Sequence, residues 1–306
     1  GNDSVAIGNH AAANINASNI IGIGAYAAHN GYGTGTTAIG FYSGYYSQTA
    51  GNTFVGYESG KGTGAAGYGS STGVGYQSLL GLTTGDDNTA IGYLAGKSLE
   101  GGGANTIVGS YAGDGTTGVD QTVLIGFFAG SGALTSDADG TIAIGYEAGK
   151  AITSAQKSTL LGYQAGKDIT TGYENTAVGG YALYSNVTGE NNTAIGAAAG
   201  WAQLNSNSTF IGHESGYYTT GSGNTFVGSE AGKGGTTSAP YSSGQNNTAV
   251  GYLAYDAFTT AVANTALGYK ALGATTTGGY NVAVGAEAGV NLTTGGENIL
   301  LGQRAG

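Results

Sequence analysis

The chain repeats one glycine-centred pattern, and this repeat restricts the fold more than any other feature of the sequence. The segment Asn88 to Gly96, which reads Asn-Thr-Ala-Ile-Gly-Tyr-Leu-Ala-Gly, has eighteen equivalents, and fourteen of the seventeen intervals between their central glycines are 16 or 17 residues. The central glycine of each repeat is position zero and falls at residues 8, 24, 40, 56, 75, 92, 109, 126, 145, 162, 179, 196, 212, 228, 251, 268, 285 and 302. A short, sustained period of this kind indicates stacked repeats.

Three positions around the central glycine are fully restricted. Position −1 is Ile, Val or Leu, position −3 is Thr, Val or Ile, and position +3 is Ala or Ser in all eighteen repeats. Position −4 is Asn in ten repeats and position +4 is Gly in twelve. The β-branched residues from −4 to −1 predict a short strand, and the remainder of each unit is rich in turn-forming residues. Frequent glycine disfavours helix.

A single unit of this size buries almost nothing, so we expect the units to stack with their strands paired in parallel. The predicted fold is all-β, a parallel β-solenoid or β-roll of about eighteen coils with a repeat of about 17 residues. Residues 1–306 are expected to form one continuous array, a fragment of a longer fibrous protein. The long intervals predict loop insertions near residues 60–72, 130–140 and 234–244.

Alternation along the strand places positions −3 and −1 on one face and positions −4, −2 and zero on the other. The aliphatic column at −1 is interpreted as the structural core, which assigns an inward orientation to Ile7, Ile39, Val55, Ile91, Val108, Ile125, Ile144, Leu161, Val178, Ile195, Ile211, Val227, Val250, Leu267, Val284 and Leu301. Position −2 is also apolar or glycine throughout. Because a thin coil cannot bury both faces, we expect copies of the chain to assemble around a cyclic axis.

Composition excludes several classes of function. Eight Lys and Arg residues against 18 Asp and Glu residues argue against nucleic-acid binding, which needs basic patches. The chain has no cysteine, which excludes disulfides and thiolate metal sites, and no apolar run long enough for a membrane span. No nucleophile elbow, phosphate-binding loop or metal-ligand cluster is recognisable, and the three histidines are interpreted as isolated surface residues. We therefore expect no enzyme activity, no catalytic residues, no metal and no cofactor.

The tyrosines are the candidate contact residues. Position +1 is aromatic in nine repeats, and stacked tyrosines can either stabilise neighbouring coils or contact a partner. The candidates for surface contacts are Tyr57, Tyr93, Tyr146, Tyr163, Tyr252 and Tyr269. Glu recurs at position +2 and Lys at position +5, a pattern that predicts a stripe of mixed charge along one corner.

The first repeat, Ser4-Val5-Ala6-Ile7-Gly8, resembles the head repeats of YadA-type trimeric autotransporter adhesins, which carry an S-V-A-I-G-x-x-A motif in each coil. Later units such as Asn175 to Gly189 resemble N-T-A-V-G-Y repeat arrays of phage tail-fibre-like and bacterial surface proteins. The resemblance covers nearly the whole chain. It implies a homotrimer of left-handed parallel β-rolls on a cell surface or virion.

We expect a structural or adhesive extracellular fibre that presents a repetitive surface for attachment to a host protein or glycan. A phage tail-fibre shaft or receptor-binding fibre is the alternative. An ice-binding β-solenoid is a third hypothesis, because Thr occupies position −3 in twelve repeats. It ranks last because position −3 shares the face of position −1, which is assigned to the interior.

Overall fold

The computed structural model describes residues 3–31, 33–64, 67–235 and 241–306. These residues form eighteen strands of three residues each and one 3-10 helix, η1 (Ser136–Ala138), with no α-helix. Every strand spans positions −3 to −1 of one repeat. The strands are β1 (Val5–Ile7), β2 (Ile21–Ile23), β3 (Thr37–Ile39), β4 (Thr53–Val55), β5 (Thr72–Val74), β6 (Thr89–Ile91), β7 (Thr106–Val108), β8 (Val123–Ile125), β9 (Ile142–Ile144), β10 (Thr159–Leu161), β11 (Thr176–Val178), β12 (Thr193–Ile195), β13 (Thr209–Ile211), β14 (Thr225–Val227), β15 (Thr248–Val250), β16 (Thr265–Leu267), β17 (Val282–Val284) and β18 (Ile299–Leu301).

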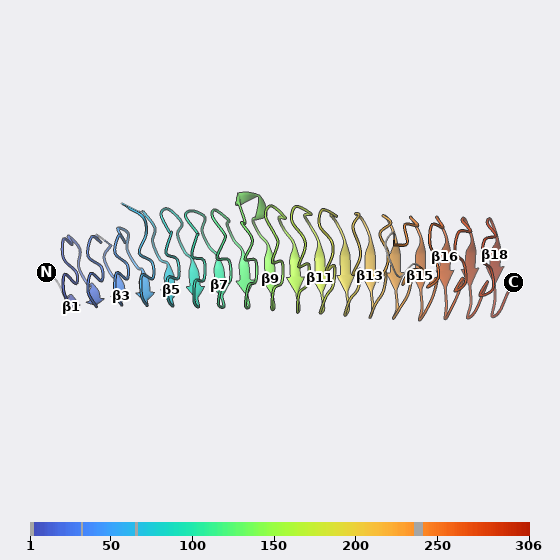
Figure 1. Ribbon diagram of the computed structural model, residues 1–306, viewed down its shortest axis with the longest axis horizontal. Helices are drawn as coiled ribbons and strands as arrows, with labels where there is room; N and C mark the ends of the chain where they lie inside the picture. Colours follow the sequence, from blue (N-terminus) through green and yellow to red (C-terminus); the bar gives the residue numbers. More distant parts are fainter. Residues whose placement is uncertain (1–2, 32, 65–66, 236–240) are drawn as a thin grey trace. The chain divides into compact units, whose positions relative to one another are not determined.

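The chain divides into two units, Gly1–Lys157 with β1 to β9 and Ser158–Gly306 with β10 to β18. Within each unit the strands pair in parallel with their neighbours in sequence, and each coil contributes one strand (Figure 1). The register joins identical repeat positions, as when Thr89 pairs with Thr106 and Ile91 with Val108. The structure thus confirms the predicted all-β parallel solenoid.

The interior of each coil is built from positions −2 and +3. Ala90, Leu124 and Phe226 at position −2 are fully buried, as are Ala95 and most other residues at position +3. Side chains at positions −3 and −1 lie on the outer side of the same strands, because alternate residues of a strand point to opposite faces. Leu160 and its neighbour Leu161 show the difference directly: the first is 0% exposed and the second is 43% exposed.

The prediction that position −1 forms the core is therefore wrong for the single chain. In the described residues, none of the predicted core side chains is buried: Ile7, Ile39, Val55, Ile91, Val108, Ile125, Ile144, Leu161, Val178, Ile195, Ile211, Val227, Val250, Leu267, Val284 and Leu301 are all half-buried or exposed. The physical reason is the thickness of the coil. The small residue at +3 lies opposite the strand inside the coil, and the size of the residue at −2 is matched to that space.

Positions −2 and +4 share a fixed volume inside the coil. All seven repeats with Phe, Leu or Ile at −2 have Gly at +4, and the four repeats with Leu or Tyr at +4 have Ala or Gly at −2. A Cβ atom on Gly166 would lie 2.7 Å from Leu160 Cδ2, and one on Gly60 would lie 2.2 Å from the Phe54 ring. Because interiors are packed to near-crystalline density, only one of the two positions can be large.

The central glycine is required by the spacing between coils. Gly92 has a φ of +140°, and a Cβ atom there would lie 2.4 Å from the carbonyl oxygen of Gly109 in the next coil. The amide of Gly109 donates to the carbonyl of Ile91 at 2.8 Å, which holds the two coils together at this point. A side chain at position zero would therefore separate the coils.

A buried column of polar side chains at position −4 completes the interior. Asn264 accepts a hydrogen bond from the backbone amide of Asn281 at 2.9 Å, and its own Nδ2 donates to the carbonyl of Gly278 at 2.9 Å. The same pattern recurs from Asn247 to Asn298 in the second unit. These side chains satisfy amides and carbonyls that would otherwise be buried without partners.

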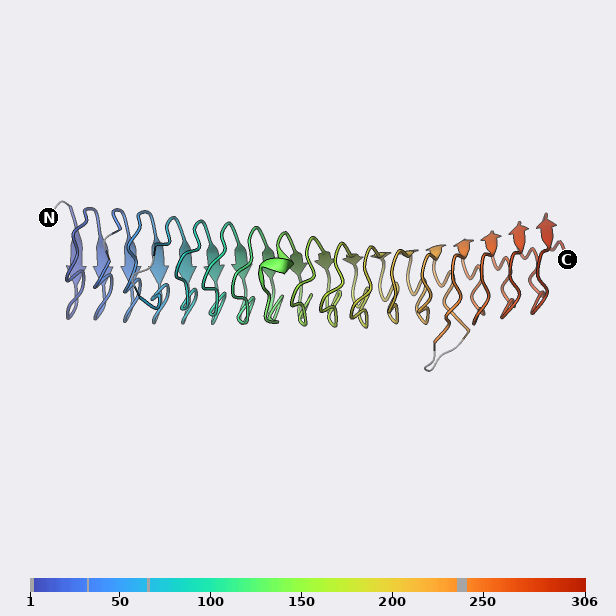
Figure 2. The same cartoon turned by 90° about the horizontal axis from the view of Figure 1, so that it is seen from above.

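The insertions leave the strand register intact. Within residues 60–72, Tyr68 is buried and its hydroxyl donates to the carbonyl of Gly60 at 2.8 Å. Residues 130–140 contain η1, the green helix at the end of the coil away from the strands in Figure 1. In the third insertion, Ser242 bridges to Thr219. Residues 65–66 and 236–240 of the predicted insertions lie outside the described residues. Figure 2 shows the same coils from above.

The matched volumes at −2 and +4 predict an interaction between two substitutions. Leu160→Ala leaves a cavity and is expected to cost about 2–5 kcal/mol. Gly166→Leu forces a side chain against Leu160 at a φ of +56° and is also expected to destabilise. The double variant reproduces the Ala177–Leu183 arrangement of the next coil, so its loss should fall below the sum of the single losses by about 0.5–3 kcal/mol.

Native-state hydrogen exchange of amides in this coil measures these losses locally. Leu161→Ala is the matched control, because the same truncation is made one residue further along on the outer face. We expect it to cost less than half as much as Leu160→Ala in dilute, unassociated protein. Equal losses for the two leucines, or strictly additive losses for the double variant, would contradict the assignment of the interior.

Candidate functional site

The outer side of the strands is the most extensive candidate site. We call it the strand face; it consists of the side chains at positions −3 and −1, one pair on each strand. In both units its side chains are half-buried or exposed, as for Thr89 and Ile91 of β6 and for Thr176 and Val178 of β11. Each unit thus carries one column of threonine and β-branched residues beside one column of Ile, Val and Leu.

The strand face is uncharged, since no charged residue occupies positions −3, −2 or −1 in any repeat. Ile91 is 42% exposed and Leu267 is 46% exposed. With nine such coils in each unit, the apolar stripe covers on the order of several hundred Å², which reaches the largest patches normally found on monomeric proteins. An apolar surface of this kind typically marks an interaction site.

A column of aromatic rings flanks the strand face at position +1. Tyr57 stacks on Tyr76 with ring centroids 5.1 Å apart, and Tyr76 stacks on Tyr93 at 5.2 Å, with interplanar angles of 7° and 16°. These three residues, the tyrosine ladder, are each 41–44% exposed. Stacking along the coil axis covers the ring faces of Tyr76 with its neighbours and leaves ring edges and hydroxyls toward solvent.

The six predicted contact tyrosines are all exposed: Tyr57, Tyr93, Tyr146, Tyr163, Tyr252 and Tyr269. Most pair with a ring of an adjacent coil, as Tyr252 does with Tyr269 at 6.0 Å. A sugar ring stacks on the free face of an aromatic side chain, and the ladder offers such a face only at its ends. The arrangement therefore favours a structural role over a platform for glycan stacking.

Sequence reasoning missed a second aromatic column at position +5. Trp201 stacks between Tyr184 and Tyr217, with centroid distances of 5.8 and 5.2 Å. Tyr241, from the longest insertion, packs edge-on against Trp201 at 6.4 Å. The signal was present in the sequence, because these three columnar residues are separated by the repeat interval.

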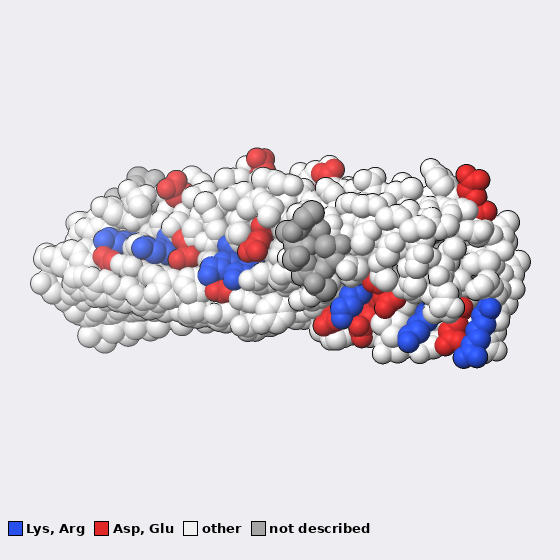
Figure 3. Space-filling model, turned by 45° about the vertical axis from the view of Figure 1, so that its right-hand side comes forward, with Lys and Arg blue, Asp and Glu red and all other residues white. Residues whose placement is uncertain are grey.

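The predicted stripe of mixed charge is confirmed. Lys61 pairs with Glu58 at 2.7 Å, and Lys233 bridges Glu214 and Glu230 at 2.6 and 2.9 Å. In Figure 3 many of the basic side chains lie directly beside acidic ones, with broad uncharged areas around them. Burial opposes ionisation of Glu58, but hydrogen bonds from Lys61 and Gln77 outweigh it and hold the pKa of this carboxyl below its ordinary value.

The interpretation of the histidines as isolated residues is wrong for one pair. His10 and His29 belong to consecutive coils, and their rings meet edge-to-face with centroids 5.7 Å apart. His10 also stacks on Tyr26, and His29 stacks on Tyr45. Among the described residues, no group of three or more His, Cys, Asp or Glu side chains is placed to hold a metal ion.

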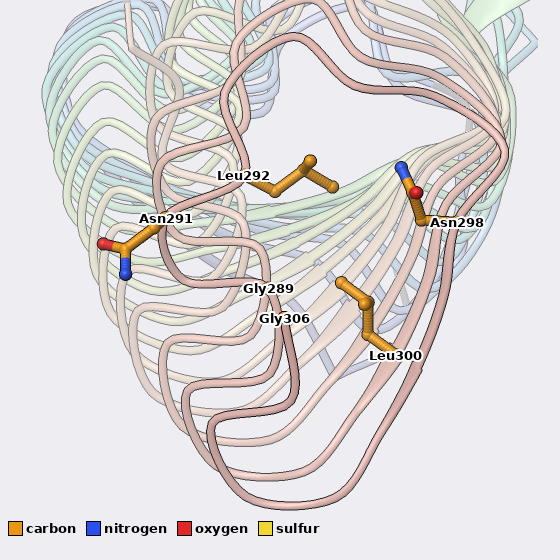
Figure 4. A pocket seen from close by; sticks show the side chains of 6 residues that line it. All are labelled: Gly289, Asn291, Leu292, Asn298, Leu300 and Gly306. Carbon is orange, nitrogen blue, oxygen red and sulfur yellow. The ribbon is translucent and has the colours of Figure 1, made fainter.

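A cavity of about 280 Å³ lies inside the last coil. Leu292, Asn298 and Leu300 line it and point into the interior of this coil (Figure 4). The equivalent space in earlier coils is filled by the side chains of the following coil, so the cavity continues the packed core and has no separate set of polar groups. No helix in the described part of the chain is both long and apolar enough to cross a membrane.

Comparison with known proteins identifies no relative. No protein-family model matches the chain, and no curated protein is significantly similar to it in sequence. The candidate site is therefore defined by the strand face, the aromatic columns and the charged corner alone.

The ion pair at Glu58 predicts a pH dependence. A carboxyl pKa that is lower in the folded state stabilises the fold above the unfolded pKa, near 4.5, and this stabilisation is lost as the pH falls through the folded value. Lys61→Met should cost up to about 1 kcal/mol at neutral pH, and the pH-dependent part of this cost should vanish in acid. Urea denaturation of both proteins from pH 7 to pH 2 measures the difference; a loss that grows below pH 4 would contradict the pairing.

Proposed function

We propose that this chain is a structural segment of an extracellular fibre whose copies associate through the strand face. The observation that carries the proposal is the combination of exposure and restriction at position −1. Ile, Val or Leu occupies this position in all eighteen repeats, although the side chain is half-buried or exposed in the single chain. A surface position that only meets water does not require an aliphatic residue in every coil.

A second copy of the same chain is the partner that fits this surface. Its columns have the same spacing of about 4.8 Å between successive strands, so side chains can interdigitate over many coils without losing register. A partner with a different repeat would fall out of step after a few coils. Identical surfaces that cover one another generate closed cyclic symmetry, and the resemblance to YadA-type heads favours a left-handed homotrimer.

The fibre function follows from multiplicity. Eighteen similar coils present the same corner and turn residues repeatedly, and weak contacts that recur along a fibre add up to strong attachment. We infer a location outside the cell, on a bacterial surface or on a virion. A phage tail-fibre shaft or receptor-binding fibre has the same architectural requirement, so it remains within the proposal.

Paired charge substitutions test self-association. Val178→Lys with Ile195→Asp places opposite charges on adjacent strands of the strand face, where they can pair in the single chain but oppose burial against another copy. We expect the unmodified protein to sediment as a trimer and the variant to associate at least ten-fold more weakly while keeping its circular dichroism spectrum.

The control is Thr171→Lys with Thr188→Asp, which places the same charges at exposed turn positions of consecutive coils. This control should still assemble. A monomeric unmodified protein, or equal weakening by both pairs, would refute association through the strand face.

Ice binding is the second candidate function, and one structural observation favours it. The sequence argument against it placed position −3 inside the coil, whereas the structure places these threonines on the strand face. Regular rows of hydroxyl and methyl groups, spaced by one strand along the stack and by two residues along each strand, form a surface that can order water.

Thermal hysteresis of the purified protein separates the two functions. If copies cover the strand face, the threonines are withdrawn from solvent, and we expect neither hysteresis nor shaping of ice crystals. Hysteresis that rises with protein concentration and disappears in the Val178→Lys, Ile195→Asp variant would instead assign the face to ice.

A further inference from the structure

The tyrosine ladder brings three oxidisable phenols into register on consecutive coils. Tyr57, Tyr76 and Tyr93 follow β4, β5 and β6, and the rings are separated by 5.1 and 5.2 Å. The backbone holds this register on both sides of the ladder. The amide of Gln77 donates to the carbonyl of Tyr57 at 2.8 Å, and the amide of Leu94 donates to that of Tyr76 at 2.9 Å.

The ladder is both reachable and preorganised. Each of the three side chains is more than 40% exposed, so a small oxidant has access to the hydroxyl and to the adjacent ring edge. Two nearly parallel rings related by one coil translation place equivalent carbon atoms about one ring separation apart. Rotation about the side-chain torsions closes the remaining gap, while the fixed backbone keeps the rings together and raises their effective concentration.

We propose that the tyrosine ladder is a site of oxidative cross-linking, where neighbouring coils are joined by dityrosine bonds. The co-reactant is a peroxide acting with a peroxidase-type one-electron oxidant. Each of two phenols loses one electron and its hydroxyl proton. The two phenoxyl radicals join through a new bond between ring carbons ortho to oxygen, and each ortho hydrogen then moves to oxygen. Hydrogen peroxide takes up the two electrons and two protons and yields two water molecules.

The product is a covalent staple between coils 16 to 19 residues apart in sequence. Such a link closes a short loop in the unfolded chain and restricts it, as a disulfide does, in a protein that has no cysteine. The ladder thus supplies a thiol-free means of cross-linking successive coils. This inference concerns contacts within one chain, so it stands or falls separately from association through the strand face.

The test uses the full chain at high dilution with peroxidase and hydrogen peroxide. Proteolysis and mass spectrometry then identify linked peptides, and dityrosine fluorescence measures the yield. We expect intrachain Tyr57–Tyr76 and Tyr76–Tyr93 links. Tyr76→Phe keeps the stacked ring but removes the central phenol, so it should abolish both links without changing the circular dichroism spectrum.

Tyr280→Phe is the control. Tyr280 is the most exposed of the large hydrophobic tyrosines, at 65%, and has no stacked ring neighbour among the described residues. This variant should retain the ladder links at the level of the unmodified protein. Failure to detect either ladder link, links that form only between chains, or persistence of intrachain links at Tyr57 and Tyr93 to position 76 at equal fluorescence yield after Tyr76→Phe would overturn the proposal.

Discussion

Parallel hydrogen bonding in constant register is the interaction on which the rest of this structure depends. Each strand pairs position for position with the next strand of its unit, so a residue type that recurs at one repeat position becomes a continuous column. The columns of Asn, Tyr, Ile and charged residues all follow from this one translation. It also explains why the insertions are tolerated: extra residues leave the coil between strands, and the next strand returns to the same register, as Val227 does with Val250 across the longest interval.

Constant register imposes a second constraint, because every coil must fit the same thin cross-section. The exchange of volume between positions −2 and +4 keeps this cross-section constant while the residues change. Phe226 with Gly232 and Ala266 with Leu272 fill the same space from opposite sides of the coil. A uniform outer surface results from this internal compensation, since no coil has to bulge to hold a larger core residue.

The repeat period and residue types were sufficient to predict the strands, their parallel stacking and the three insertions. They were not sufficient to predict which strand face is internal, since alternation defines two faces and both were apolar. The deciding information was the small residue at +3 and the coupling of −2 with +4, which report on interior volume and leave −1 unconstrained. Reading the aliphatic column at −1 as the core therefore reversed the coil, and it hid the threonines of the strand face.

Some of the local backbone was beyond sequence reasoning. Position +2 has a positive φ in all eighteen repeats, for example 53° at Glu58 and 58° at Leu94, yet it is never glycine. A left-handed conformation costs an ordinary residue roughly 1–2 kcal/mol, so no local signal predicts it. The hydrogen bond from each such amide to the preceding coil, as from Glu58 to Phe41 at 2.8 Å, compensates for the strain, and this bond exists only after the coils have stacked.

The two columns of the strand face distinguish the demands of strand formation from those of a partner. Thr, Val and Ile all favour strands because their side chains branch at Cβ. If strand formation alone selected residues, Thr would occur at both positions. It fills −3 in twelve repeats and is absent from −1 in all eighteen, where unbranched-at-Cβ Leu is accepted instead. Position −1 therefore requires apolar surface rather than β-branching, and in a single chain that surface has nothing to pack against.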